Sequence, residues 1–193
     1  LRERARGTER KLRQIVQGIF PSVLTNLGLM PALRTYIEHL SARPIPSPHR
    51  LELELEATGL DDGRLPEEIE IGLYRVIQQG VTNAIQHSQA KKLRVDLTWV
   101  GTEVTLTISD DGVGFDVSNP ENTIASGHFG LVNLRDRISA LDGDCEIESR
   151  PSVGTTIQAR VPTHGRASET TDVRRSITVL GHQDAVQDKT QEE

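Results

Sequence analysis

Residues 74–88 read YRVIQQGVTNAIQHS and belong to a longer segment, 66–88, that decides the fold. This segment begins with a proline, which suits the first position of a helix, and its apolar residues recur at helical spacing. On the predicted helix Gln79, Asn83 and His87 fall at i, i+4 and i+8, so they form a polar stripe opposite the apolar face. A helix face that is simply exposed to solvent has the same pattern. This segment alone therefore does not decide between a functional site and an ordinary solvated face.

The segments around this helix alternate apolar and polar residues, as strands do in a sheet with one wet face. Leu51, Leu53 and Leu55 alternate with glutamates and predict a strand before the helix. A hairpin is predicted after it, because two alternating segments are joined by the short turn Gly101–Thr102. The predicted elements after residue 90 are strands at 92–100 and 103–110, a helix at about 131–141, and strands at 145–149 and 155–161.

The two ends of the chain differ from this central region. A helix is predicted to end near Phe20, and after a break over 22–30 a second helix is predicted to begin at Pro31 and to stop before Pro44. Residues 164–193 are polar and lack a sustained period, which predicts a disordered tail.

The composition excludes several classes of protein. The chain has 193 residues, which suits one domain with flanking segments, and its formal net charge of -6 argues against nucleic acid as the main partner. The single cysteine, Cys145, excludes an internal disulfide and any multi-cysteine metal site. No membrane-spanning apolar run and no signal peptide are visible, so we expect a cytoplasmic location.

Two further motifs contain glycines beside polar residues. In ISDDGVGF (108–115), Asp110 stands at the end of a predicted strand and is followed by Gly112 and Gly114. In SGHFGLVNLRDR (126–137), a glycine-containing loop leads into a helix, whose first N–H groups can bind phosphate. Each motif in isolation is also compatible with an ordinary turn.

Taken together and in this order, TNAIQH (82–87), ISDDGVGF, SGHFGLVNLRDR and SVGTTIQARVP (152–162) resemble the ATP-binding fold shared by gyrase, Hsp90, histidine kinases and MutL. The resemblance covers roughly residues 50–162. It implies an α+β fold of the Bergerat type, a two-layer sandwich with helices on one face of a mixed, mostly antiparallel sheet.

The same resemblance implies roles for individual residues. Asn83 would bind Mg²⁺ through its side-chain oxygen, and Asp110 would accept the amino group of adenine. The implied catalytic residues are Asn83, Gln79 and His87, and the implied ATP-binding residues are Asp110, Gly112, Gly114, Gly127, His128, Phe129, Gly130, Leu131 and Thr155, of which 127–130 form the lid over the phosphates.

Within that superfamily the chain is most similar to sensor histidine kinases of the NarX/DegS/LiaS type. The segment GIFPSVLTNLGLMPALRTYIEHL (18–40) looks like the second half of their dimerisation region. The implied organisation is a partial dimerisation and phosphotransfer region at 1–45, an ATP-binding catalytic domain at 46–163 and the tail at 164–193. The implied partners are a second copy of the chain, bound through the N-terminal helices, and a response regulator; the parent protein of such a domain can be membrane-anchored.

Two departures from the family pattern keep alternatives open. No histidine here occupies the position of the phosphate acceptor, so we expect the chain to begin partway through the dimerisation hairpin. Gln79 stands where many relatives have glutamate, and an amide cannot act as a general base. A non-catalytic ATP-sensing module and a serine kinase of the anti-sigma-factor type are the alternatives, although the preceding helical hairpin argues against the serine kinase.

Overall fold

The computed structural model describes residues 22–41, 51–60, 63–117, 129–163 and 175–180. The helices are α2 (Leu29–Ser41), α3 (Glu67–Asn83), the π-helical segment η1 (Ala84–Ser88) and α5 (Phe129–Ser139). The strands are β1 (Glu52–Thr58), β2 (Lys92–Val100), β3 (Glu103–Asp110), β4 (Asp144–Arg150), β5 (Gly154–Pro162) and β6 (Arg175–Leu180). In this part of the chain no helix has the length and apolar character needed to cross a membrane.

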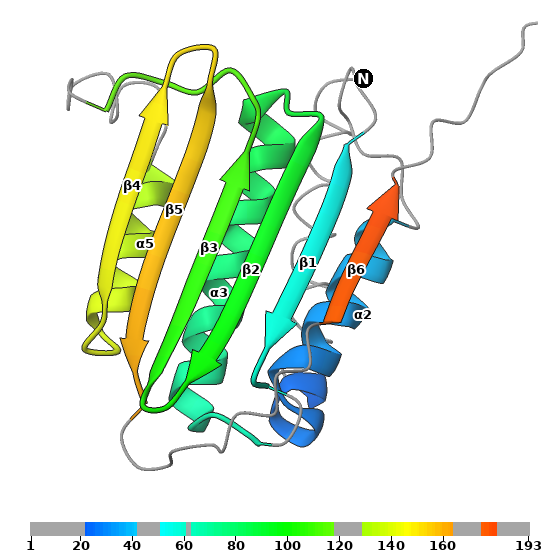
Figure 1. Ribbon diagram of the computed structural model, residues 1–193, viewed down its shortest axis with the longest axis vertical. Helices are drawn as coiled ribbons and strands as arrows, with labels where there is room; N and C mark the ends of the chain where they lie inside the picture. Colours follow the sequence, from blue (N-terminus) through cyan, green and yellow to red (C-terminus); the bar gives the residue numbers. More distant parts are fainter. Residues whose placement is uncertain (1–21, 42–50, 61–62, 118–128, 164–174, 181–193) are drawn as a thin grey trace, which may run out of the picture.

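The six strands form one sheet in the order β4-β5-β3-β2-β1-β6. Only β1 and β2 are parallel, and the connection between them carries α3; every other neighbouring pair is antiparallel. The helices α2, α3 and α5 all lie on the same side of this sheet, so the molecule has two layers (Figure 1). The predicted two-layer α+β fold is therefore confirmed.

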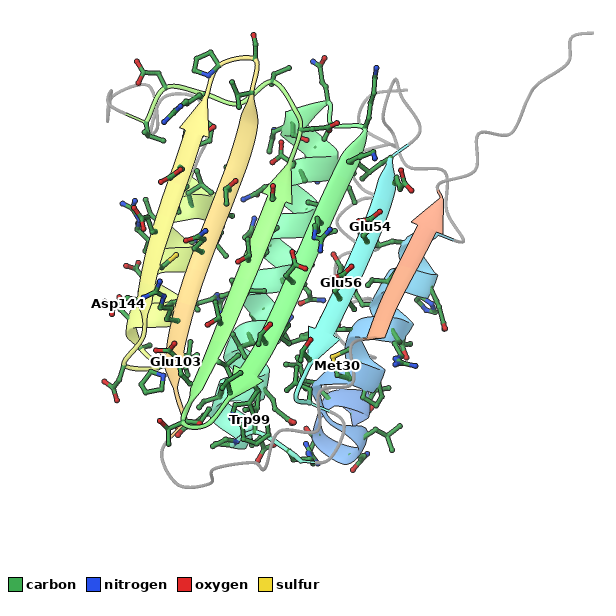
Figure 2. All side chains as sticks on the ribbon, in the orientation of Figure 1. Met30, Glu54, Glu56, Trp99, Glu103 and Asp144 are labelled. Carbon is green, nitrogen blue, oxygen red and sulfur yellow. The ribbon has the colours of Figure 1, made fainter. Side chains whose placement is uncertain are left out.

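The sheet is covered on one side because its strands alternate. In β1 the leucines are buried under the helices, whereas Glu54 and Glu56 lie on the open face shown in Figure 2. Arg94 of β2 lies among these acids, with its guanidinium 2.9 Å from Glu56 and 2.8 Å from Asp96. The open face is therefore polar here, and Arg94 offsets part of the negative charge of Glu54, Glu56 and Asp96.

The helix α2 contributes to the hydrophobic core. Leu33, Tyr36 and Ile37 are almost fully buried in the same cluster as the apolar residues of α3 and the strands. The apolar face of α2 is thus already covered within the chain. Residues 1–21, where the rest of the predicted dimerisation helices would lie, are outside the described residues.

The predicted start of this helix was wrong by a short distance. Residues 22–27 are already helical, Gly28 adopts a φ of +89°, and α2 starts at Leu29 rather than at Pro31. Pro31 falls within the first turn, where its missing N–H leaves no helical hydrogen bond unmade. The predicted end before Pro44 is consistent with the observed end at Ser41.

The prediction of a disordered tail over 164–193 was wrong for six residues. β6 pairs with β1 in antiparallel register, with Leu180 opposite Glu52 and Arg175 opposite Ala57. β6 therefore covers what would otherwise be a free edge of the sheet beside β1. The other residues of that range beyond Thr163 lie outside the described residues.

Leu73→Ala should show how strongly the fold depends on α3. Leu73 is fully buried, so truncation leaves a cavity between the helix and the sheet and should reduce the free energy of unfolding by about 2–5 kcal/mol. Ile71→Ala on the same helix is the matched control, because Ile71 is 41% exposed and its loss should change stability by about 0.5 kcal/mol or less. Urea denaturation followed by circular dichroism measures both, and similar losses in the two variants would contradict this account of the core.

Candidate functional site

A cavity opens where the C-terminal end of α3 meets the ends of β3 and β5 and the start of α5. Its volume is about 670 Å³, counting the space at its open mouth. Its lining comes from segments far apart in the sequence: Gly80, Asn83, Ala84, His87, Ser88, Ile108, Asp110, Val113, Gly114, Phe115, Gly130, Leu131, Thr155 and Ile157. All four of the sequence motifs therefore meet here, the fourth through the first residues of β5.

The pairing of β3 with β5 shapes one wall of the cavity. Ile108 lies opposite Ile157 and Asp110 lies opposite Thr155, so an apolar pair is followed by a polar pair on the same face. Both isoleucines are buried, and together they present an apolar surface that suits a flat aromatic ring. The carboxylate of Asp110 lies at the end of that surface, where it can fix the orientation of a ring bearing a hydrogen-bond donor.

The carboxylate of Asp110 is half-buried and partly satisfied by the backbone. Its Oδ1 accepts a hydrogen bond from the N–H of Gly112 at 2.9 Å. Burial raises the pKa of Asp110 above its usual range, although backbone hydrogen bonds from Gly112 and Thr155 lower it in part. A carboxylate held in this way is a strong acceptor for an amino group entering the cavity.

The loop after β3 can follow its path only with a glycine at position 114. Gly114 has a φ of +57°, and a Cβ placed there would lie 2.0 Å from the carbonyl oxygen of Arg150. The loop therefore presses against the β4–β5 turn. The next residue, Phe115, donates its backbone N–H to Ser149 Oγ at 2.9 Å, which holds the loop beside the cavity.

The polar stripe of α3 meets the first turn of α5. Gln79 Nε2 donates a hydrogen bond to Asn83 Oδ1 at 2.7 Å. A Cβ at Gly130 would lie 2.9 Å from Gln79 Nε2 and 3.1 Å from Asn83 Oδ1, so the lack of a side chain at Gly130 allows the two helices to approach this closely. The first turn of α5 therefore lies beside Gln79 and Asn83, and the N-terminal end of a helix favours an anion such as phosphate.

The last turn of the predicted long helix is π-helical. From Ala84 to Ser88 the helix widens, and His87 still lines the cavity although its angular offset from Asn83 differs from that of a regular helix. Ser88 fixes this end, since its carbonyl accepts the N–H of Val113 at 2.7 Å and its Oγ donates to the carbonyl of Ala84 at 2.7 Å. Single-turn π segments inside helices are frequent at functional sites.

Two serines were missed by sequence reasoning. Ser88 is one, and Ser149 is the other: its Oγ lies 3.0 Å from Thr155 Oγ1 and donates to the carbonyl of Gly154 at 3.0 Å. The sequence did contain a signal for Ser149. Side chains alternate along β4, so Ser149 lies on the same inward face as Ile147, yet it is polar. A buried polar residue at such a position indicates a hydrogen-bonded role.

The structure brings most of the predicted site residues together. Those that line the cavity are Asn83, His87, Asp110, Gly114, Gly130, Leu131 and Thr155. Gln79 and Gly112 border it through their hydrogen bonds to Asn83 and Asp110. Phe129 is the first residue of α5, whereas Gly127 and His128 lie outside the described residues.

Comparison with known proteins gives one family match and several relatives. Residues 68–165 match the family described as histidine kinase-, DNA gyrase B- and HSP90-like ATPase. The signal transduction histidine-protein kinase/phosphatase DegS of Brevibacillus brevis is 29% identical over 84% of this chain and 39% of its own length. The nitrate/nitrite sensor protein NarX of Escherichia coli K12 is 34% identical over 76% of this chain and 23% of its own length. The chain thus spans well under half the length of these relatives.

Solved structures share the fold at lower identity. A blue-light activated histidine kinase of Erythrobacter litoralis has a TM-score of 0.51 and 21% identity, covering 70% of this chain and 42% of that one. Full-length ShkA in complex with AMPPNP has a TM-score of 0.54 and 17% identity, covering 70% of this chain and 30% of that one.

Gly114→Ala should distort the cavity, and Gly101→Ala provides a matched control. Both glycines have a positive φ, +57° and +58°, but nothing lies within 4 Å of a Cβ at Gly101. The backbone strain is therefore shared, and the contact with Arg150 should add a further loss of about 1–3 kcal/mol in Gly114→Ala only. Urea denaturation of both variants checks this, and equal losses would show that the loop has room to move.

Proposed function

Because the chain belongs to the histidine kinase-, DNA gyrase B- and HSP90-like ATPase family, we propose that the cavity between α3 and α5 binds ATP together with Mg²⁺. The observation that supports this most directly is the meeting of Asp110, Asn83 and the start of α5 around one cavity. These features offer, in turn, an acceptor for an amino group, an oxygen ligand for a hard cation and free N–H groups for phosphates.

In this proposal the base lies against Ile108 and Ile157 and donates its amino group to Asp110. Thr155, which is held by Ser149, closes the polar end of the base site. The phosphates lie toward the start of α5, under a lid formed by Gly127, His128, Phe129 and Gly130. Leu131 contributes an apolar contact at the edge of the cavity, and Gly112 and Gly114 carry the backbone past the nucleotide.

Asn83 fits the requirements of a magnesium ligand. Its Oδ1 is an amide oxygen, which hard cations accept, and it lies where the first turn of α5 approaches. Among the described residues no group of three His, Cys, Asp or Glu side chains could hold a metal ion. Mg²⁺ in this position would therefore depend on Asn83, water and the phosphates, and when bound it would neutralise charge developing on the phosphates.

In the whole protein we propose that the γ-phosphoryl group passes to a histidine outside this chain and then to an aspartate of a response regulator. The residues of this chain contribute mainly by positioning the nucleotide, with His87 lining the phosphate side of the cavity beside Asn83. Neutral imidazole is already a nucleophile, so transfer to histidine does not need a general base at Gln79. Hydrolysis by water should be slow for the same reason, because an amide cannot take up the proton.

The partners and location belong to the same proposal. A homodimer through the N-terminal segment 1–45 would not use Leu33, Tyr36 or Ile37 of α2, because these side chains are buried within the chain. The site is expected to work in the cytoplasm.

One observation favours a second function, an ATP-sensing module without phosphotransfer: Gln79 pairs with Asn83 and supplies no carboxylate beside the phosphates.

Asp110→Asn should lose nucleotide affinity while keeping or gaining stability. If the asparagine oxygen keeps the hydrogen bond from Gly112, its NH₂ faces the amino group of adenine, and two donors meet. We expect the affinity for an ATP analogue to fall by about tenfold or more in isothermal titration calorimetry. Unchanged affinity would remove Asp110 from the site.

The stability of the same variant follows from the direction of the pKa shift. The pKa of Asp110 is raised in the folded protein, mainly by burial, so the carboxyl stabilises the fold while protonated and this contribution is lost as pH rises through the folded pKa. At neutral pH Asp110→Asn should therefore have a Tm equal to or higher than wild type. The difference should shrink in acid, and a Tm clearly lower at pH 7 would contradict the assignment.

Asn83→Ala should strongly reduce phosphotransfer in a reconstituted reaction. The chain is mixed with ATP, Mg²⁺ and a separately produced acceptor helix, and acid-labile phosphohistidine is measured. Loss of a metal-ligand oxygen should lower the transfer rate by about tenfold or more, whereas Asn133→Ala on the exposed side of α5 should leave it unchanged. Absence of transfer in wild type would favour the ATP-sensing module, and acid-stable phosphoserine on a partner would favour the serine kinase.

A further inference from the structure

The hydrogen bond between Gln79 and Asn83 involves the atom that the proposed function assigns to magnesium. Gln79 Nε2 donates to Asn83 Oδ1 at 2.7 Å, and the two side chains lie one helical turn apart on α3. We propose that Gln79 is a positioning residue that engages this oxygen in the metal-free state, so that Mg²⁺ has to displace its amide. This consequence rests on the proposed function: with Gln79 in place, nucleotide binding requires a higher Mg²⁺ concentration than it would without the donor of this side chain.

The hydrogen bond and the metal would share one oxygen in a closely packed part of the site. The position of a Cβ on Gly130 lies 2.9 Å from Gln79 Nε2, 3.1 Å from Asn83 Oδ1 and 3.2 Å from Asn83 Nδ2. The first turn of α5 therefore packs against the paired amides. Mg²⁺ binds oxygen at about 2.0–2.1 Å, needs near-octahedral geometry and keeps several of its waters. The N–H of Gln79 already draws on the electron density of Asn83 Oδ1 and places a partial positive charge beside it. Mg²⁺ therefore binds this oxygen less favourably until the amide of Gln79 turns over or swings away.

The chemistry of the side chain at position 79 decides whether such competition exists. A carboxylate has no proton to donate, so a glutamate could only accept from Asn83 Nδ2, which would turn Asn83 Oδ1 outward and leave it free. A glutamine can donate as well as accept, and in this structure it donates to Oδ1. Gln79 thus stabilises an arrangement of Asn83 that a glutamate would not permit.

A purely structural role for the pair makes a different prediction. Polar pairs at i and i+4 support an isolated helix by about 0.2–0.5 kcal/mol, and on that view removal of Gln79 would change stability slightly and leave the metal requirement unaltered. The magnesium dependence of nucleotide binding therefore separates the two roles. It also reports on binding alone, without any need for phosphotransfer.

Gln79→Met and Gln79→Glu are the test variants, and Gln78→Met is the matched control. Methionine keeps the length of the side chain and removes its donor. Gln78 occupies the adjacent position of α3 but bonds to Tyr74 and Arg75 instead of Asn83. Binding of a non-hydrolysable ATP analogue is measured by calorimetry over a series of free Mg²⁺ concentrations, and the Mg²⁺ concentration that gives half of the maximal affinity is compared between proteins.

We expect Gln79→Met to lower that Mg²⁺ concentration by about 3- to 10-fold, the equivalent of one neutral hydrogen bond released. Gln79→Glu should lower it at least as far, and Gln78→Met should leave it unchanged. An unchanged or higher Mg²⁺ requirement in Gln79→Met, with nucleotide still bound, would overturn the inference and leave the proposed function intact. Gln79→Glu adds a negative charge that itself attracts Mg²⁺, so an unchanged or higher requirement in that isosteric variant would overturn the inference even if Gln79→Met fails to fold. No nucleotide binding by any of the folded proteins would overturn the proposed function itself.

Discussion

The register between β3 and β5 is the constraint on which the site depends. It sets Ile108 opposite Ile157 and Asp110 opposite Thr155, all on the face that the helices cover. Because side chains alternate along a strand, a slip of β3 by one residue would turn both Ile108 and Asp110 to the open face. The register is well specified, since the same alternation buries the apolar core of both strands.

The helix α3 supplies the other side of the site, and it too has one apolar face and one polar face. Its apolar face is buried against the sheet, and the orientation of Gln79 and Asn83 toward α5 follows from that packing. The N-terminal end of the same helix is attached to the preceding helical residues through Arg64, whose guanidinium ion-pairs with the buried Glu70 at 2.6 Å and donates to the carbonyl of Leu24 at 3.0 Å. A movement of residues 22–27 would thus act directly on the helix that carries Asn83.

Much of this arrangement could be predicted from the sequence, because the signals were local. Alternation and a two-residue turn predicted the hairpin of β2 and β3 with its correct bounds, and the order of the motifs predicted a family that the matched residues confirm. Features that depend on distant contacts were missed. Six residues of β6 gain their structure from pairing with β1, and the π-helical turn at Ala84–Ser88 is held by Ser88 and the loop at Val113. Local propensity carries no information about either contact.

The position of β6 has a consequence for biosynthesis. Its partner β1 lies early in the chain, and Glu52 finds Leu180 opposite it only after the whole sheet between them has been made. On the ribosome, the N–H and C=O groups along that edge of β1 would remain uncovered until β6 emerges, and an uncovered edge is a template for intermolecular pairing. A nascent chain of this design therefore gains from a chaperone or from rapid elongation through its last strand, since closing so large a loop is slow compared with forming the local hairpin of β2 and β3.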